Sequence, residues 1–282
     1  MITIDNLTFT YPGRHNPTIG NLSLQLPEGS VYGLLGRNGV GKSTLLYLIA
    51  GLLTPNTGRI EFDGIDPRRR LPSTTASIFI VPEELTLPEI SLRDYVAINA
   101  PFYPNFSHDD LHRHLETFEI DPRMRYKLTN LSMGQRKKVF MSFALACNTP
   151  LVLMDEPTNG LDIPGKMAFR RFIASSVNEN RTIIISTHQV RDIETLLDNV
   201  LIIDSERVLL NASTAEIGRR LAFVHTSDAE VAARALYAQP SVGGISAVLP
   251  NDGSFDTEIN LECLFELAST RPDELAEIFN KQ

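Results

Sequence analysis

Apolar and polar positions divide the chain into segments of different kinds. Short apolar runs occur at residues 31–35, 77–81, 151–154, 183–185 and 200–203. Runs of this length between polar residues are typical of strands buried on both faces of a parallel sheet. Residues 2–11 and 22–26 come close to alternating between apolar and polar, which predicts half-buried antiparallel strands in an N-terminal β subdomain.

Helical spacing of apolar residues characterises two further segments. It covers residues 45–53, directly after the first buried run, and it dominates residues 84–145. The second segment lies between two buried runs, so we expect a helical subdomain of about 84–145 inserted between strands of the sheet. Ser107 precedes Asp109 and Asp110, which is typical of a helix start.

The C-terminal part of the chain has a different pattern. Residues 221–282 contain helix-like patches at 229–238 and 261–280, with a strand-like segment at 245–249 between them. We therefore expect an α/β domain over residues 1–220, followed by a small α+β appendage over 221–282.

Composition narrows the class of protein. The chain has 282 residues and a net charge of −8, which does not favour a long nucleic-acid-binding face. Its two cysteines lack metal-ligand spacing and indicate a reducing compartment without a disulfide framework. The N-terminus does not resemble a signal peptide, and no apolar run approaches the roughly 20 residues of a membrane helix. We expect any role at a membrane to require a partner.

A glycine-rich segment joins the run at 31–35 to the helical segment at 45–53. It reads Gly36, Arg37, Asn38, Gly39, Val40, Gly41, Lys42, Ser43 and Thr44. Glycines let backbone N–H groups curl around phosphate oxygens, and the following helix directs its positive end at the same oxygens. Lys42 can reach the β- and γ-phosphates, and Ser43 can bind Mg²⁺. This context predicts an α/β P-loop NTPase that binds a nucleoside triphosphate, rather than an ordinary glycine-rich turn.

Two further buried runs end in polar side chains. The run at 151–154 is followed by Asp155, which can hold Mg²⁺, and by Glu156, which can polarise the attacking water. The alternative is an acidic surface turn. The run at 183–185 leads to His188, which can reach the γ-phosphate, although a lone histidine is more often structural.

Two other segments have both a structural and a functional interpretation. Tyr11, at the edge of a turn-rich loop, can pack on the core or stack on a purine base. Ser132 and Gln135, separated by Met133 and Gly134, fit a capping box at the start of a helix. On its own this pattern indicates only a well-capped helix, and its functional interpretation depends on the acids that follow at 155 and 156.

Together these residues resemble the ATP-binding subunit of ABC transporters, over residues 2–221. The similar elements are the Walker A loop at 36–44, the Walker B strand at 151–156, the signature at 131–135, the D-loop at 159–162 with Asp162, the switch histidine His188 and the base-stacking Tyr11. The resemblance implies a RecA-like core, ATP and Mg²⁺ as cofactors, and ATPase activity.

The resemblance also implies an assembly. Two ATP-binding subunits, in a homodimer or heterodimer, hold two ATP molecules head to tail. Each ATP lies between one Walker A loop and the other subunit's Ser132, Gly134 and Gln135. The pair would work with an integral membrane permease on the cytoplasmic face of the membrane, with residues 85–95 facing the permease's coupling helix.

Two positions depart from the family pattern. Met133 stands where the first signature glycine is usual, and Glu83 stands where a glutamine usually senses Mg²⁺ and water. Glu83 can still bind the metal, together with Ser43 and Asp155, but it adds negative charge beside the γ-phosphate. The appendage is most similar to those of ABC-2-type exporters, which implies export. The alternatives are a soluble ABC-type ATPase acting on ribosomes or nucleic acid, and a regulatory subunit that only binds ATP.

Overall fold

The computed structural model describes residues 1–123, 127–253 and 255–280. Its centre is a six-stranded sheet in the order β5-β6-β7-β3-β8-β9. The strands are β5 (Ile78–Val81), β6 (Leu151–Asp155), β7 (Thr182–Ser186), β3 (Val31–Leu35), β8 (Asn199–Ile203) and β9 (Val208–Ser213). All neighbours pair in parallel except β8 and β9. Every residue of β3, β6 and β7 is buried, which confirms the prediction of strands covered on both faces.

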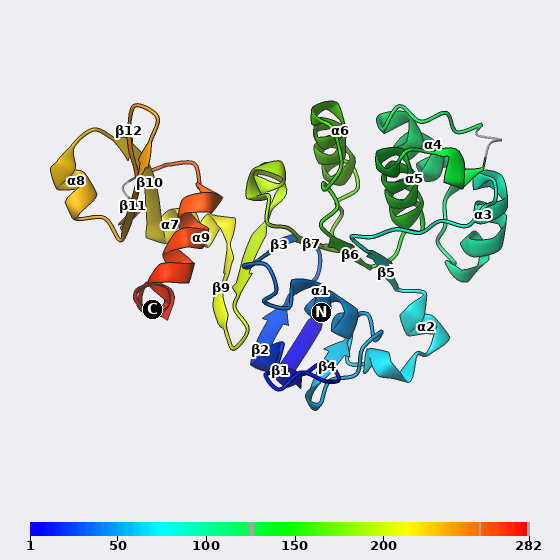
Figure 1. Cartoon of the computed structure of the whole chain (residues 1–282), viewed down its shortest axis with the longest axis horizontal. Helices are drawn as coiled ribbons and strands as arrows, with labels where there is room; N and C mark the ends of the chain where they lie inside the picture. Colours follow the sequence, from blue (N-terminus) through cyan, green and yellow to red (C-terminus); the bar gives the residue numbers. More distant parts are fainter. Residues whose placement is uncertain (124–126, 254, 281–282) are drawn as a thin grey trace.

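A second, antiparallel sheet lies below the first in Figure 1. Its order is β2-β1-β4, formed by β1 (Ile2–Phe9), β2 (Ile19–Leu26) and β4 (Thr57–Phe62). Helix α1 (Lys42–Ile49) fills the space between the two sheets, since its Leu45 and Leu48 share one core cluster with residues of both. The predicted N-terminal β subdomain is therefore confirmed.

The predicted helical insertion lies between β5 and β6. It contains α3 (Leu92–Asn99), α4 (His108–Thr117) and α5 (Met133–Ala146), coloured green and cyan in Figure 1. Ser107 caps α4 as expected, because its hydroxyl accepts the Asp110 amide. Phe143 of α5 lies against Phe79 of β5, with ring centres 6.0 Å apart, and thereby holds the helices to the sheet edge.

The C-terminal segment forms a third sheet, in the order β10-β12-β11. The strands of this sheet are β10 (Leu221–Thr226), β11 (Tyr237–Ser241) and β12 (Gly244–Pro250). Helix α7 (Thr214–Arg220) precedes the sheet, and the segment also contains α8 (Ala229–Ala233), α9 (Leu261–Thr270) and α10 (Pro272–Asn280). The strand expected at 245–249 is confirmed.

Two helix predictions in this segment were wrong in extent. The helix expected at 229–238 ends at Ala233, because residues from Tyr237 onward pair with β12 instead. The helix expected at 261–280 is two helices, since Pro272 restricts the preceding Arg271 to a non-helical conformation.

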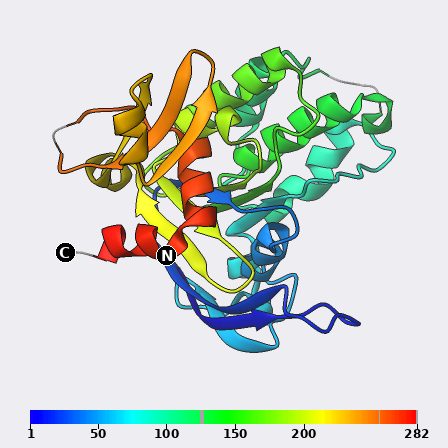
Figure 2. The same cartoon turned by 60° about the vertical axis from the view of Figure 1, so that its left-hand side comes forward.

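Helix α10 packs on strand β9, and α9 packs on β9 and on the short helical turn at Val190–Asp192. Figure 2 shows the two helices beside the strands of the central sheet. Leu264 and Leu267 of α9 belong to the same core cluster as Ile193 and Val200. Arg191 also pairs with Glu262 at 2.6 Å. Helix α9 is thus held close to the segment that follows β7. Within the described part of the chain, no helix is both long enough and apolar enough to cross a membrane.

Candidate nucleotide-binding site

The glycine-rich loop lies between β3 and α1, as predicted. Gly39 and Gly41 have φ angles of 83° and 103°, which strongly favour glycine. A Cβ atom at Gly41 would also lie 3.0 Å from the Thr18 carbonyl oxygen. The backbone here requires glycine, and it leaves the amides at the N-terminus of α1 without side chains above them.

Lys42 arches back over this loop. Its Nζ donates to the carbonyl oxygens of Gly36 at 2.8 Å and Arg37 at 3.4 Å, and the residue is 7% exposed. Burial lowers the pKa of the ammonium group. Three carboxylates act against this lowering: Glu156, Asp155 and Glu83. A buried cation is therefore held beside the loop, and phosphate oxygens are suitable ligands for both the cation and the loop amides.

A cavity of about 390 Å³ opens above the loop. Its lining includes most of the predicted nucleotide and catalytic residues: Tyr11, Asn38, Gly39, Gly41, Lys42, Ser43, Thr44, Glu83, Glu156 and His188. They come from the loop and from the segments that follow β1, β5, β6 and β7. The carboxyl ends of the parallel strands thus gather the site, as is general for open α/β sheets.

Sequence reasoning missed two lining residues, Arg14 and Thr18. Arg14 places its guanidinium carbon 6.0 Å from the centre of the Tyr11 ring. Thr18 is 8% exposed, and its hydroxyl has no hydrogen-bond partner among the described residues. Both lie in the turn-rich stretch after Tyr11, so their nearness to Tyr11 in the sequence was the only available signal.

Tyr11 packs on neighbouring side chains, as one of its two interpretations predicts, and its stacking on a base stays a prediction. Its hydroxyl lies 3.2 Å from the Thr44 hydroxyl, and its ring packs edge-on against Phe9 at 4.8 Å. It also lines the cavity while only partly buried. The ring is thus held by Phe9 and Thr44 and is partly exposed where it lines the cavity.

Glu156 is held from the side of β7. Its Oε1 lies 2.8 Å from Nδ1 of His188 and accepts the His188 backbone amide at 3.1 Å. The Thr187 hydroxyl donates to Oε2 at 3.1 Å. Glu156 itself has a φ of 44°, an unusual value for a residue with a side chain. The structure brings the predicted catalytic acid and the predicted switch histidine into direct contact.

Asp155 lies one residue deeper. It is 1% exposed, its carboxylate accepts the Ser186 hydroxyl, and it is not among the residues that line the cavity. Among the described residues, no group of three or more histidine, cysteine, aspartate or glutamate side chains is arranged to hold a metal ion. Ser43 and Glu83 do line the cavity together. The metal assignments stay predictions.

The signature residues lie elsewhere. Ser132 accepts the Gln135 amide at 3.2 Å and Gln135 accepts the Ser132 amide at 3.0 Å, which confirms the capping box. Neither Ser132, Gly134 nor Gln135 lines the cavity. A Cβ atom at Gly134 would lie 3.3 Å from the Gly160 carbonyl oxygen, so the signature and the D-loop are neighbours.

Asp162 also lies outside the cavity. It caps the N-terminus of α6 (Ile163–Ala174), where its carboxylate accepts the Gly165 amide at 3.0 Å. The predicted residues therefore form two groups, one around the cavity and one at the N-termini of α5 and α6.

The class of P-loop ATPases is defined by three features that this site has. They are a sheet with a parallel core, a phosphate loop with a buried lysine, and an acid at the end of β6, which lies two strands from the loop strand β3. Residues 19–159 match the family model described as ABC transporter. The chain belongs to this family, and it is an ATPase.

Two relatives illustrate the family membership. The chain is 31% identical to the ABC transporter ATP-binding protein NatA of Bacillus subtilis (strain 168), over 68% of this chain and 80% of the relative. It is also 31% identical to the bacitracin transport ATP-binding protein BcrA of Bacillus licheniformis, over 74% of this chain and 68% of the relative.

Solved structures share the fold. An ATP-binding subunit of an ABC transporter aligns with a TM-score of 0.69 at 24% identity, covering 78% of this chain and 92% of that one. A dimeric post-hydrolysis structure of an ATP-binding cassette with ADP and phosphate gives 0.66 at 24% identity, covering 76% and 98%. These likenesses support the predicted P-loop core with its antiparallel and helical additions.

We expect Lys42→Ala to weaken ATP binding. Removing a charge-assisted contact costs about 2 kcal/mol, or roughly thirtyfold in Kd. Calorimetric titration with ATP measures the change. Lys127→Ala, which removes an exposed ammonium outside the cavity, is the control and leaves the Kd unchanged. Equal affinity of Lys42→Ala and the unaltered protein would contradict the placement of the phosphates.

Proposed function

We propose that this chain is the ATP-hydrolysing subunit of an exporter, and that it drives transport through a separate membrane permease from the cytoplasmic face of the membrane. One observation carries the proposal: the cavity contains the loop and the catalytic pair, whereas the exposed signature lies outside it. A site divided in this way fits closure between two subunits.

We assign different functions to the residues around the cavity. Lys42 and the loop amides bind the phosphates, and Tyr11 stacks on the base. Ser43 and Glu83, with Asp155 behind them, fit Mg²⁺ because hydroxyl and carboxylate oxygens are its preferred ligands. The ion supplies charge neutralisation when it is bound.

Hydrolysis requires a base at the γ-phosphate. Glu156 accepts a proton from the attacking water, whose oxygen bonds to phosphorus as the bond to the ADP oxygen breaks. In the structure described here, His188 and Thr187 hold both carboxylate oxygens of Glu156. This arrangement keeps the base in a fixed position. His188 itself lines the cavity, which supports its proposed contact with the γ-phosphate.

The signature is proposed to act on the other subunit's ATP. The N-terminus of the 14-residue helix α5 is capped by Ser132, and Met133 beside it is 78% exposed. Ile163 and Met167 of the adjacent α6 are exposed as well. An anion site flanked by exposed apolar side chains suits a surface that another subunit covers.

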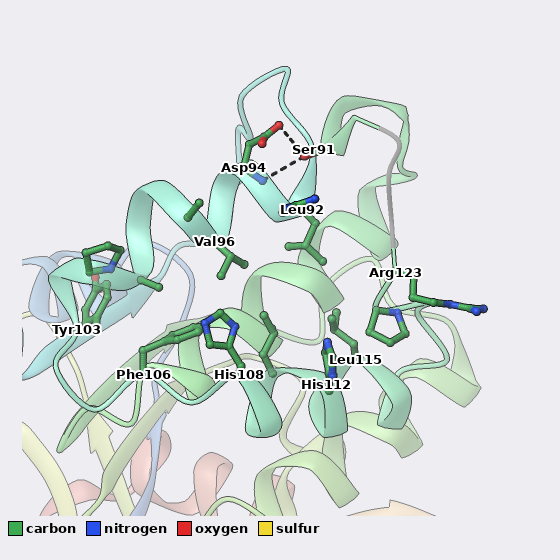
Figure 3. Close-up of a pocket in the computed structure, with 16 residues that line it drawn as sticks. Ser91, Leu92, Asp94, Val96, Tyr103, Phe106, His108, His112, Leu115 and Arg123 are labelled. Carbon is green, nitrogen blue, oxygen red and sulfur yellow. Dashed lines mark hydrogen bonds between the residues drawn. The ribbon is translucent and has the colours of Figure 1, made fainter.

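A groove in the helical insertion fits the permease. Its volume is about 1150 Å³. Figure 3 shows its lining residues on α3 and α4 and on the segment that joins them. Leu92 and Val96 of α3 and Leu115 of α4 line it as buried apolar residues, and Arg93 and Arg123 are exposed lining residues. Apolar side chains flanked by cations favour an amphipathic helix with acidic residues, which is what we propose the permease presents. The groove includes part of the segment predicted to face the permease.

Glu156→Gln tests the hydrolytic role. We expect ATP binding to persist and phosphate release to fall at least about a hundredfold, because the amide cannot take the proton. The variant should also form a stable ATP-dependent dimer, measured by size-exclusion chromatography with light scattering. Turnover equal to that of the unaltered protein would refute the role of Glu156.

Charge reversal tests the groove. The double variant Arg93→Glu with Arg123→Glu should lose most of its binding to native membrane vesicles that contain the permease, because like charges then meet at the edge. Sedimentation with the vesicles measures binding. Arg59→Glu, which changes an exposed arginine of the β subdomain, should bind normally. Unchanged binding of the double variant would place the docking surface elsewhere.

A further inference from the structure

A buried lysine of α5 is bonded to the turn that carries the catalytic acid. Lys137 is 5% exposed, and its Nζ donates to the carbonyl oxygens of Glu156 at 2.9 Å and Asn159 at 3.0 Å. Hydrogen bonds from a charged donor are the stronger kind. They hold the segment from Glu156 to Asn159 in place, including the positive φ at Glu156.

Asn159 extends this connection to two more parts of the site. Its side-chain amide donates to Oε1 of Glu83 at 3.0 Å, and its side-chain oxygen accepts from Gln189 at 2.8 Å. Gln189 directly follows the switch histidine. One asparagine therefore joins Lys137, the cavity acid Glu83 and the residue beside His188.

The charged groups around Lys137 are carboxylates, whose negative charge its ammonium group offsets. Burial lowers the pKa of Lys137, and three carboxylates oppose this effect, with Glu83 acting more strongly than Glu156 and Asp155. Lys42 is a buried cation on which the same three acids act, and it is proposed to bind the phosphates. When phosphates engage Lys42, Lys137 remains to offset the negative charge of Glu83.

We propose that Lys137 is a positioning residue for hydrolysis, which neutralises Glu83 across Asn159 and fixes the Glu156 turn. Because Lys137 lies on the helix that begins at Ser132, it also joins the signature to the hydrolytic end of the same chain's cavity. The proposal rests on the proposed roles of Glu83 and Glu156.

A double-mutant cycle tests it. Glu83→Gln, Lys137→Gln and the double variant are compared with the unaltered protein for kcat and KM of ATP hydrolysis and for Tm. Glutamine at 137 still offers an N–H donor but no charge. We expect Lys137→Gln to lower kcat at least about tenfold with KM little changed, since the excess negative charge acts on the transition state. The double variant should recover most of this loss.

Additive effects of the two substitutions on kcat would overturn the proposal, because independent sites show no coupling. A second outcome would also overturn the proposal. If Lys137→Gln lowers both Tm and kcat, and adding Glu83→Gln restores neither, the lysine has a purely structural role. If Lys137→Gln does not fold, Lys137→Met replaces it in the cycle, both alone and combined with Glu83→Gln. The same outcomes then decide.

A matched control removes a charged pair outside the site. Asp5→Asn with Arg59→Gln breaks an exposed pair at 2.8 Å in the β subdomain and should leave kcat unchanged in every combination. Failure of the proposed function is distinguishable, since it would appear as hydrolysis that persists in Glu156→Gln. The coupling between Glu83 and Lys137 is interpreted once Glu156→Gln has been shown to abolish hydrolysis.

Discussion

The parallel pairing of β3, β7 and β6 is the constraint on which the rest of the structure depends. In this register Leu34 lies opposite Ser186, and Ser186 lies opposite Asp155. The strands therefore end at the same edge, where the phosphate loop, His188 and Glu156 follow them. None of these side chains is near another in the sequence, and only the shared edge brings them into one cavity.

Much of this could be predicted from the sequence, because apolar runs identify strands buried on both faces and glycine spacing identifies the loop. The buried core strands, the N-terminal β subdomain and the helical insertion were all expected. The least accurate predictions concerned the C-terminal segment. There, pairing with β12 overrode the helical pattern after Ala233, and Pro272 divided the last helix. The domain boundary at 220 stays a prediction.

Contacts made by residues that belong to no motif could not be predicted from the sequence. Arg14 and Thr18 reach the cavity from a loop, and Lys137 forms bonds to backbone carbonyls nineteen and twenty-two positions away. A carbonyl group has no signature in a sequence, so a lysine that binds two of them resembles any other lysine of a basic helix. The charge of Glu83 was visible, but its connection through Asn159 to a buried cation was not.

The central claim is that the cavity is half of a site and that the signature of a second subunit completes it. Mixing two inactive variants tests this most directly. Lys42→Ala disables the loop and Ser132→Phe blocks the signature, so each should be inactive alone. In a mixed dimer one composite site is intact, and an equimolar mixture should recover up to about a quarter of normal phosphate release. Full activity of Ser132→Phe alone, or no recovery on mixing, would contradict the account.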